Sequence, residues 1–234
     1  SHFPLRQRWQ KPITDDPNQM EAIMAESVVI LSGARTAIGS FDGSLSSIPP
    51  IELGAAAAKA AIDRSGVDAE EIDQAVFGNI IHTEPRDMYL SRAVSIAAGV
   101  KLDTPALTLN RLCGSGLQAI ISGAQSIMLG DASTMLVGCA ESMSRSPHAT
   151  RSIRTGHKMG DLAFTDMLIG VLSDPFDGAH MGVTAENVAK DKGINRETQD
   201  KIAVESHRRA INAIDKGFFK DQIIPIEVKS RRET

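Results

Sequence analysis

Short apolar runs alternate with longer segments of helical periodicity along residues 27–140, and this alternation constrains the fold more than any other feature of the sequence. An apolar run of about four to eight residues is typical of a buried strand, whereas apolar residues at i, i+3 and i+4 indicate one face of a helix. Strands that alternate with helices form βαβ units, whose sheets are parallel or mixed and carry helices on both faces. We therefore expect an α/β fold.

The apolar runs and the glycines that follow them set the expected boundaries. The expected strands are residues 27–31, 75–81, 106–109 and 133–138. The expected helices between them are residues 51–65, 87–98 and 116–129, with Gly66, Gly99 and Gly130 as their ends. From Glu141 onward the rhythm breaks, and we expect helices over 161–171, 184–190 and 196–216, with Asn195 and Gly217 as the caps of the last one, and a strand over 223–228.

Length, charge and cysteine count exclude several classes of protein. A chain of 234 residues buries a core without disulfides, and its formal net charge of −4 excludes a globally basic nucleic-acid binder while leaving room for local basic clusters. Two cysteines form neither a disulfide framework nor a four-cysteine zinc site. No run reaches the ~18 apolar residues of a membrane span. We expect a cytoplasmic protein, with the mitochondrion as the alternative.

The first 26 residues lack the apolar stretch of a secretory signal and show no helical periodicity. Arg6, Arg8 and Lys11 are weakly typical of a transit peptide, whereas Asp15 and Asp16 argue against one. We expect residues 1–26 to be a leader or an expression remnant that is not part of the folded core.

Cys113 lies in Asn110-Arg-Leu-Cys-Gly-Ser-Gly-Leu117, between a predicted strand and a predicted helix. Such a turn exposes a side chain beside the free N–H groups of a helix start, which is where an α/β fold presents a nucleophile. A helix end alone offsets at most about 2 kcal/mol of the cost of ionising a thiol, so we expect a histidine or another base nearby. The residues leave open the alternative that Cys113 is a small buried apolar residue. Cys139, inside an apolar run, is expected to be structural.

Further motifs occur in order along the chain and carry a family resemblance. They are Arg35-Thr-Ala-Ile-Gly39, Glu141-Ser-Met-Ser144, Lys158-Met-Gly-Asp161 and His180-Met-Gly-Val-Thr-Ala-Glu-Asn187. Together with the Cys113 segment, they closely resemble the thiolases, which are the acetyl-CoA C-acetyltransferases and related β-ketothiolases. The resemblance implies a layered α-β-α fold with a mixed sheet, in which residues 27–140 form the N-terminal domain and residues 141–234 an incomplete loop domain.

The resemblance also implies roles for individual residues. Cys113 would attack an acyl-CoA carbonyl and become acylated, with its own backbone N–H in the oxyanion hole. His180, Met181 and Leu172 would line the acyl and pantetheine pocket, although a lone histidine beside apolar residues is more often structural. Arg231 would contact the nucleotide end of coenzyme A, with Lys229 and Arg232 as helpers.

The partners implied by the resemblance are acetyl-CoA and short-chain acyl-CoA, with coenzyme A as substrate and product and with no other cofactor or metal. We expect a homodimer or homotetramer. We expect no binding to nucleic acid or to a membrane. Residues 144–158 resemble the loop through which tetrameric thiolases associate. Arg145, Arg151, Arg154 and His157 in this stretch equally fit an exposed basic surface.

The chain departs from the thiolase pattern in extent. Thiolases have a second half with an Asn-Glu-Ala-Phe segment, a Gly-His-Pro motif with the activating histidine and a Cys-x-Gly motif with the second catalytic cysteine, and none of these occurs here. We therefore expect an N-terminal half that is inactive alone. The alternatives are a degradative 3-ketoacyl-CoA thiolase, a β-ketoacyl synthase, an inactive CoA-binding or interaction half, and a cysteine hydrolase that pairs Cys113 with His180 or His157.

Overall fold

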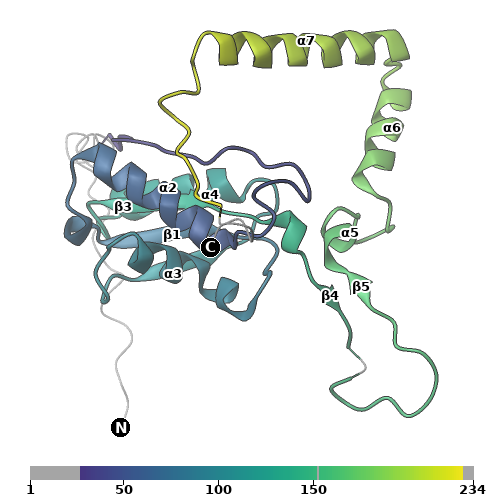
Figure 1. Cartoon of the computed structure of the whole chain (residues 1–234), viewed down its shortest axis with the longest axis horizontal. Helices are drawn as coiled ribbons and strands as arrows, with labels where there is room; N and C mark the ends of the chain where they lie inside the picture. Colours follow the sequence, from purple (N-terminus) through teal and green to yellow (C-terminus); the bar gives the residue numbers. More distant parts are fainter. Residues whose placement is uncertain (1–26, 152, 229–234) are drawn as a thin grey trace, which may run out of the picture. The chain divides into compact units, whose positions relative to one another are not determined.

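A computed structural model of the chain describes residues 27–151 and 153–228 (Figure 1). The chain divides into residues 1–30 and residues 31–234. The described part of the first unit, residues 27–30, has no regular secondary structure, and the expected leader over 1–26 lies outside the described residues. The helices and strands of the described residues lie in the second unit.

Helices and strands alternate up to Cys139, and helices dominate after it. The first part contains α2 (Pro50–Ser65), the 3-10 turn η1 (Ala69–Glu71), β1 (Gln74–Gly78), η2 (Pro85–Tyr89), α3 (Leu90–Ala97), β2 (Ala106–Leu109), α4 (Ser115–Met128) and β3 (Met135–Cys139). The second part contains η3 (Met143–Arg145), β4 (His148–Ala149), β5 (Thr165–Asp166), α5 (Met167–Val171), α6 (Met181–Asp191) and α7 (Arg196–Asp215).

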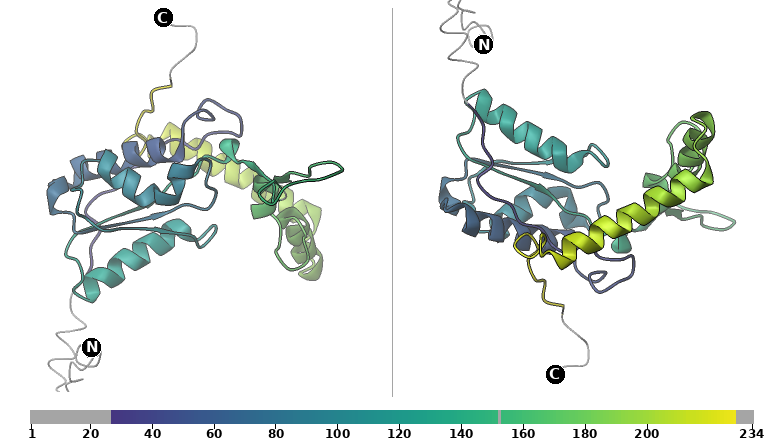
Figure 2. Two further views of the ribbon diagram at one scale, coloured as in Figure 1. Left: turned by 90° about the horizontal axis from the view of Figure 1, so that it is seen from below. Right: turned by 90° about the horizontal axis from the view of Figure 1, so that it is seen from above.

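The first part forms the predicted α-β-α layers. The sheet has the order β2-β1-β3, and all three strands are parallel. Gly78 at the end of β1 lies opposite Leu109 of β2 and Cys139 of β3, so the three carboxyl ends are level. Helices α2 and α3 cover one face of the sheet and α4 covers the other (Figure 2). The βαβ expectation is confirmed, with a sheet that is parallel throughout the described strands.

The two faces of the sheet are packed differently. Between the sheet and α2 with α3 lies a cluster of large apolar side chains, in which Leu90 and Val94 are fully buried and Phe77 nearly so. On the other face α4 approaches the sheet through small residues, such as Ala119, which is fully buried. Leu117, Ile120, Ile121 and Met128 on the same helix are exposed.

Several predicted helix ends are confirmed. Gly66 ends α2 with φ 73° and Gly217 follows α7 with φ 71°, a left-handed conformation that glycine adopts at no steric cost. At the start of α7 the Oδ1 atom of Asn195 accepts a hydrogen bond from the N–H of Thr198 at 2.9 Å, as an N-cap does.

Among residues 27–151 and 153–228, no helix has the length and apolar character needed to cross a lipid bilayer.

Three expected elements differ from the structure. Residues 27–31 form no strand, and the expected strand over 223–228 is reduced to one bridge, in which Arg35 N donates to Gln222 O at 3.0 Å and Ile224 N donates to Arg35 O at 2.8 Å. The helix expected from residue 161 begins only at Met167, because Thr165–Asp166 pair with His148–Ala149. A strand exists only through bonds to a neighbouring strand, and an apolar β-branched run shows the tendency without naming the partner.

Candidate active site

Cys113 lies in the turn between β2 and α4, at the carboxyl edge of the sheet. The Oδ1 of Asn110 accepts a hydrogen bond from Leu112 N at 2.9 Å, and the Oγ of Ser115 accepts one from Arg111 N at 2.8 Å and donates one to Leu112 O at 2.7 Å. Leu112 has φ 46°, in the left-handed region. These bonds fix a tight turn whose Cys113 is exposed. The placement between strand and helix is confirmed, and the alternative of a buried apolar residue does not fit.

The chemistry available at this turn comes from the helix that follows it. Cys113 stands two residues before Ser115, the first residue of the 14-residue helix α4. The first N–H groups of a helix have no partner within it and carry partial positive charge, which favours an anion at this point. The turn that carries Cys113 therefore adjoins the positively polarised end of α4.

The first turn of α4 lies directly on the ends of two strands. A Cβ added to Gly78 would lie 2.6 Å from the Cβ of Ser115, and one added to Gly116 would lie 2.9 Å from the Sγ of Cys139. Neither glycine has room for a side chain, so both allow the helix start to approach the sheet. For Gly78 the signal was present in the sequence, because a glycine within an apolar strand pattern indicates a close backbone approach.

The prediction that Cys139 belongs to the core needs correction. It is the last residue of β3, and it is exposed at the carboxyl edge, although its sulfur lies against Gly116. Partial burial raises the pKa of the Cys139 thiol, and the negative charge of Glu141 raises it further. The apolar run correctly predicted a strand, but the end of a strand leaves the layer that covers its middle.

Buried polar groups join the segments that follow β1 and β3. Asn79 is 1% exposed, and its Nδ2 donates to Ala140 O at 3.0 Å. The carboxylate of Glu141 accepts from Ile80 N at 2.5 Å and from Ile81 N at 3.3 Å. Burial raises the pKa of Glu141, while its hydrogen bonds from Ile80 and Ile81 oppose the shift. The sequence reasoning missed Asn79, whose signal was an amide directly after the glycine that ends an apolar run.

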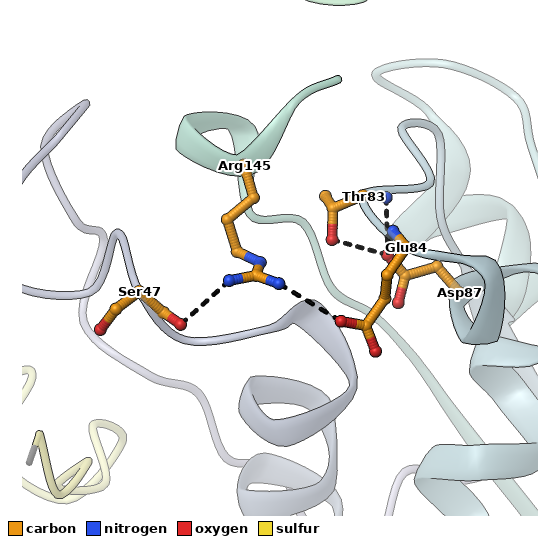
Figure 3. A network of polar contacts seen from close by, with 5 residues as sticks. All are labelled: Ser47, Thr83, Glu84, Asp87 and Arg145. Atoms are coloured by element: carbon orange, nitrogen blue, oxygen red, sulfur yellow. Dashed lines mark hydrogen bonds and ion pairs between the residues drawn. The ribbon is translucent and has the colours of Figure 1, made fainter. Parts of the chain in front are cut away.

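Arg145 has partners inside the molecule, which neither of its two sequence interpretations included. Its guanidinium donates to Ser47 O at 3.2 Å and pairs with Glu84 at 3.3 Å, and its side chain is 30% exposed (Figure 3). Beside it the fully buried Asp87 accepts three hydrogen bonds, from the N–H and hydroxyl of Thr83 and from Glu84 N. The other three basic residues named for this stretch, Arg151, Arg154 and His157, are exposed.

Leu172, His180 and Met181 are brought together by one closed loop between α5 and α6. Met181 N donates to Leu172 O at 2.9 Å, and Ser173 and His180 form an antiparallel bridge. His180 is the N-cap of α6, and its Nδ1 accepts from Gly182 N at 3.1 Å, which leaves the ring proton on Nε2. These bonds join the three predicted pocket residues to one another and do not extend to Cys113. Predicted Arg231, with Lys229 and Arg232, lies outside the described residues.

The described residues contain no group of three or more His, Cys, Asp or Glu side chains arranged to hold a metal ion. The arrangement that they do contain is an exposed thiol at the start of a helix, on the carboxyl edge of a parallel sheet. Ligands of α/β proteins bind at this edge. The arrangement is suited to nucleophilic attack on a carbonyl carbon.

Several known proteins are similar to this chain in sequence. The sequence is 54% identical over 209 residues to Beta-ketothiolase BktB of Cupriavidus necator, covering 89% of this chain and 53% of that protein. It is 43% identical over 209 residues to the cytosolic acetyl-CoA acetyltransferase of Mus musculus, covering 89% of this chain and 52% of the relative. The chain thus spans about half the length of the curated relatives that it matches.

Solved structures of similar proteins superpose on this chain. The crystal structure of the Bacillus anthracis acetyl-CoA acetyltransferase superposes with a TM-score of 0.83 at 38% identity, covering 88% of this chain and 52% of that one. The human mitochondrial 3-ketoacyl-CoA thiolase in complex with CoA superposes with a TM-score of 0.82 at 40% identity, covering 86% and 51%. The sequence-family model for the N-terminal domain of thiolases matches residues 28–234 of this chain. The chain therefore belongs to the thiolase family.

Proposed function

We propose that this chain is the nucleophile-bearing part of a biosynthetic-type thiolase, an acetyl-CoA C-acetyltransferase that makes or cleaves short-chain β-ketoacyl-CoA. The observation that carries the proposal is the exposed Cys113 at the start of α4, in the segment that matches the nucleophile motif of the family. Residues 27–140 are the domain that carries the nucleophile. Residues 141–234 belong to the loop domain for CoA binding and association.

In the first step the thiolate of Cys113 attacks the carbonyl carbon of an acyl-CoA thioester. A bond forms between that carbon and Sγ, and the negative charge of the tetrahedral intermediate faces the N–H groups at the start of α4. The bond to the CoA sulfur then breaks, and coenzyme A leaves with the proton that the cysteine lost. The product is an acyl thioester on Cys113.

In the second step the α-carbon of acetyl-CoA, deprotonated by a base, attacks the acyl carbon on Cys113. The new carbon–carbon bond forms as the bond to Sγ breaks, which releases β-ketoacyl-CoA and the thiolate. The base and the histidine that activates the cysteine belong to the half of the thiolase pattern that this sequence does not contain. The chain alone is therefore proposed to be inactive in condensation.

Leu172, His180 and Met181 are proposed to line the acyl and pantetheine pocket. Their support is the closed loop in which Met181 N is bonded to Leu172 O, because such a loop presents two apolar side chains and an imidazole from one fixed backbone. Arg231, with Lys229 and Arg232, is proposed to meet the phosphates of coenzyme A, since an acidic protein needs local positive charge for such a ligand. No cofactor besides coenzyme A as substrate is proposed.

The complete enzyme is proposed to be a homodimer or homotetramer in the cytoplasm. The resemblance of residues 144–158 to the loop through which tetrameric thiolases associate supports the oligomer, and the cytosolic mouse relative supports the location. The human mitochondrial neighbour supports the mitochondrion as the alternative location.

The decisive experiment is intact-mass measurement of the chain after incubation with acetyl-CoA, followed by peptide mapping. We expect one slowly formed acetyl adduct on Cys113, which is absent in Cys113→Ala and present in Cys139→Ala. A chain that binds CoA without ever forming the adduct would instead be an interaction or CoA-binding module.

A degradative 3-ketoacyl-CoA thiolase is the second candidate, favoured by the 40% identity to the human mitochondrial 3-ketoacyl-CoA thiolase. Relative rates of the complete enzyme on acetoacetyl-CoA and on a long-chain 3-ketoacyl-CoA separate the two. Preference for the long chain would replace our first choice by the second.

A further inference from the structure

Four hydrogen bonds join the two segments that leave the sheet after β1 and β3, and the side chains of Asn79 and Glu141 make three of them. We call these four bonds the strand-end clasp. The clasp consists of the bond from Asn79 Nδ2 to Ala140 O at 3.0 Å, the bonds from Ile80 N and Ile81 N to the Glu141 carboxylate, and the bond from Ala140 N to Gly78 O at 3.2 Å. It is reciprocal, because each segment supplies a side chain to the backbone of the other.

The clasp continues to the third strand through the backbone of Asn79. The N–H of Asn79 donates to Leu109 O at 3.0 Å, and Leu109 is the last residue of β2. The next residue, Asn110, begins the turn that carries Cys113. One nearly inaccessible residue thus holds the ends of β1, β2 and β3 at one level.

The far side of the turn rests on the same place. Ser115 closes the turn through its Oγ, and its Cβ packs on Gly78, the residue directly before Asn79. Both ends of the Cys113 turn are therefore attached to the segment Gly78–Asn79. A shift of this segment moves Leu109 and Ser115 together, and with them the thiol and the start of α4.

We propose that Asn79 and Glu141 are positioning residues for Cys113: by clasping the strand ends, they hold the turn in the geometry that presents the thiol to the helix start. In this proposal neither side chain contacts the substrate. The proposal rests on the proposed role of Cys113 as acyl nucleophile, and it adds two residues that the motif around Cys113 does not contain.

A matched control lies at the opposite edge of the same sheet. Thr104 is 4% exposed, and its Oγ1 donates to Ile72 O at 3.1 Å, which joins the segments that enter β2 and β1. Thr104→Val removes a buried side-chain bond between the β2 and β1 segments, at the end of the sheet away from Cys113. Its loss of stability is the background against which a specific effect on Cys113 is measured.

The test compares Asn79→Ala, Asn79→Ser, Glu141→Gln and Thr104→Val in the full chain. The rate of alkylation of Cys113 by iodoacetamide is measured against pH, with peptide mapping to separate Cys113 from Cys139, and urea unfolding gives the stability of each variant. We expect each clasp variant to slow alkylation of Cys113 at neutral pH by about two- to fivefold, the size of a helix-terminus effect, with its pH profile displaced upward. Thr104→Val should leave the rate and the profile unchanged.

The outcomes are separable. Clasp variants that stay folded and alkylate with the wild-type rate and profile overturn the proposal, and so does a Thr104→Val variant with the same change as Asn79→Ala. Asn79→Ser and Glu141→Gln keep the test valid where Asn79→Ala does not fold. Acetylation by acetyl-CoA is measured in parallel. A clasp effect on alkylation without any acetylation of wild type would sink the proposed function alone, whereas acetylation of wild type without a clasp effect would sink the positioning role alone.

Discussion

The Cβ of Ser115 occupies the space that a side chain at Gly78 would need, with only 2.6 Å between the two Cβ positions. Ser115 is 1% exposed, and its hydroxyl holds both Arg111 and Leu112. The end of β1 and the turn that carries Cys113 are therefore in direct contact. One added methyl group at Gly78 would force the backbone of β1 or the backbone at Ser115 to move.

Gly78→Ala should lower the free energy of unfolding by about 1–3 kcal/mol, the usual cost of overpacking a closed site. Urea unfolding measures this effect. Gly33→Ala is the control, because a Cβ at Gly33 meets no atom within 4 Å. It should be neutral or stabilise slightly, since alanine restricts the unfolded chain. Equal losses at both glycines would contradict the contact between Ser115 and Gly78.

Glu141 should make stability depend on pH. Burial raises the pKa of Glu141 in the folded chain. A raised acid pKa contributes stability that is fully present below the unfolded value of about 4.3 and is lost as pH rises through the folded value. The free energy of unfolding of wild type relative to Glu141→Gln should therefore fall as pH rises above about 4.3. A difference that stays constant or grows with pH in urea unfolding would show that the carboxylate is not held in a desolvated place.

Cys139 should react more slowly than an ordinary thiol at neutral pH, although it is exposed. Burial of its sulfur raises the pKa of Cys139, and the charge of Glu141 adds to the shift. The pH midpoint for its alkylation by iodoacetamide, followed by peptide mapping, should lie above the ordinary thiol value of about 8.5. Glu141→Gln should lower that midpoint. A midpoint that does not respond to Glu141→Gln would remove the charge as a cause.

Glu205 on α7 should titrate far below an ordinary glutamate. Hydrogen bonds from Arg208 and Arg209, each 2.7 Å long, lower the pKa of Glu205 to about 2. A lowered acid pKa contributes stability above the unfolded value, and this is lost as pH falls through about 2. The carboxyl signal in an NMR titration should have its midpoint there, and added salt should raise it because the site is exposed.

Removing the two guanidinium groups supplies the control for Glu205. Arg208→Gln combined with Arg209→Gln should return the midpoint towards about 4.3. Arg196→Gln on the same helix should leave the midpoint in place, because Arg196 pairs with Asp200. An unchanged midpoint in the double variant would contradict the ion pairs.

The elements that the sequence predicted well are those specified by local chemistry. The helix ends at Gly66 and Gly217 and the cap at Asn195 depend on a single residue and its immediate neighbours, and the apolar run over Ala106–Leu109 coincides with β2. The expected strand over 27–31 depended on a partner that its own residues do not identify. Pairing is non-local, so the pattern indicated the tendency and not the strand.

The same division holds for the candidate site. The strand-turn-helix context placed Cys113 correctly, because glycines and an apolar periodicity on either side define it. The contacts of Ser115 with Gly78 and of Arg145 with Glu84 join residues 37 and 61 positions apart, and no spacing rule connects them. Asn79 was missed for this reason: its hydrogen bonds run to the ends of two other strands, and the strand order β2-β1-β3 is visible only in the fold.

His180 has an observed role as the cap of α6 and a proposed role in the acyl pocket, and a pair of substitutions can separate them. Its Nδ1 caps α6 by accepting from Gly182 N, and its imidazole is proposed to face the acyl pocket. His180→Ala should lower the protection of α6 amides against hydrogen exchange by about 1 kcal/mol through loss of the cap, whereas His180→Asn should keep the protection, because asparagine is a preferred N-cap. Both variants should lose acyl transfer in the complete enzyme. Full activity of His180→Asn would show that His180 serves only as the cap of α6.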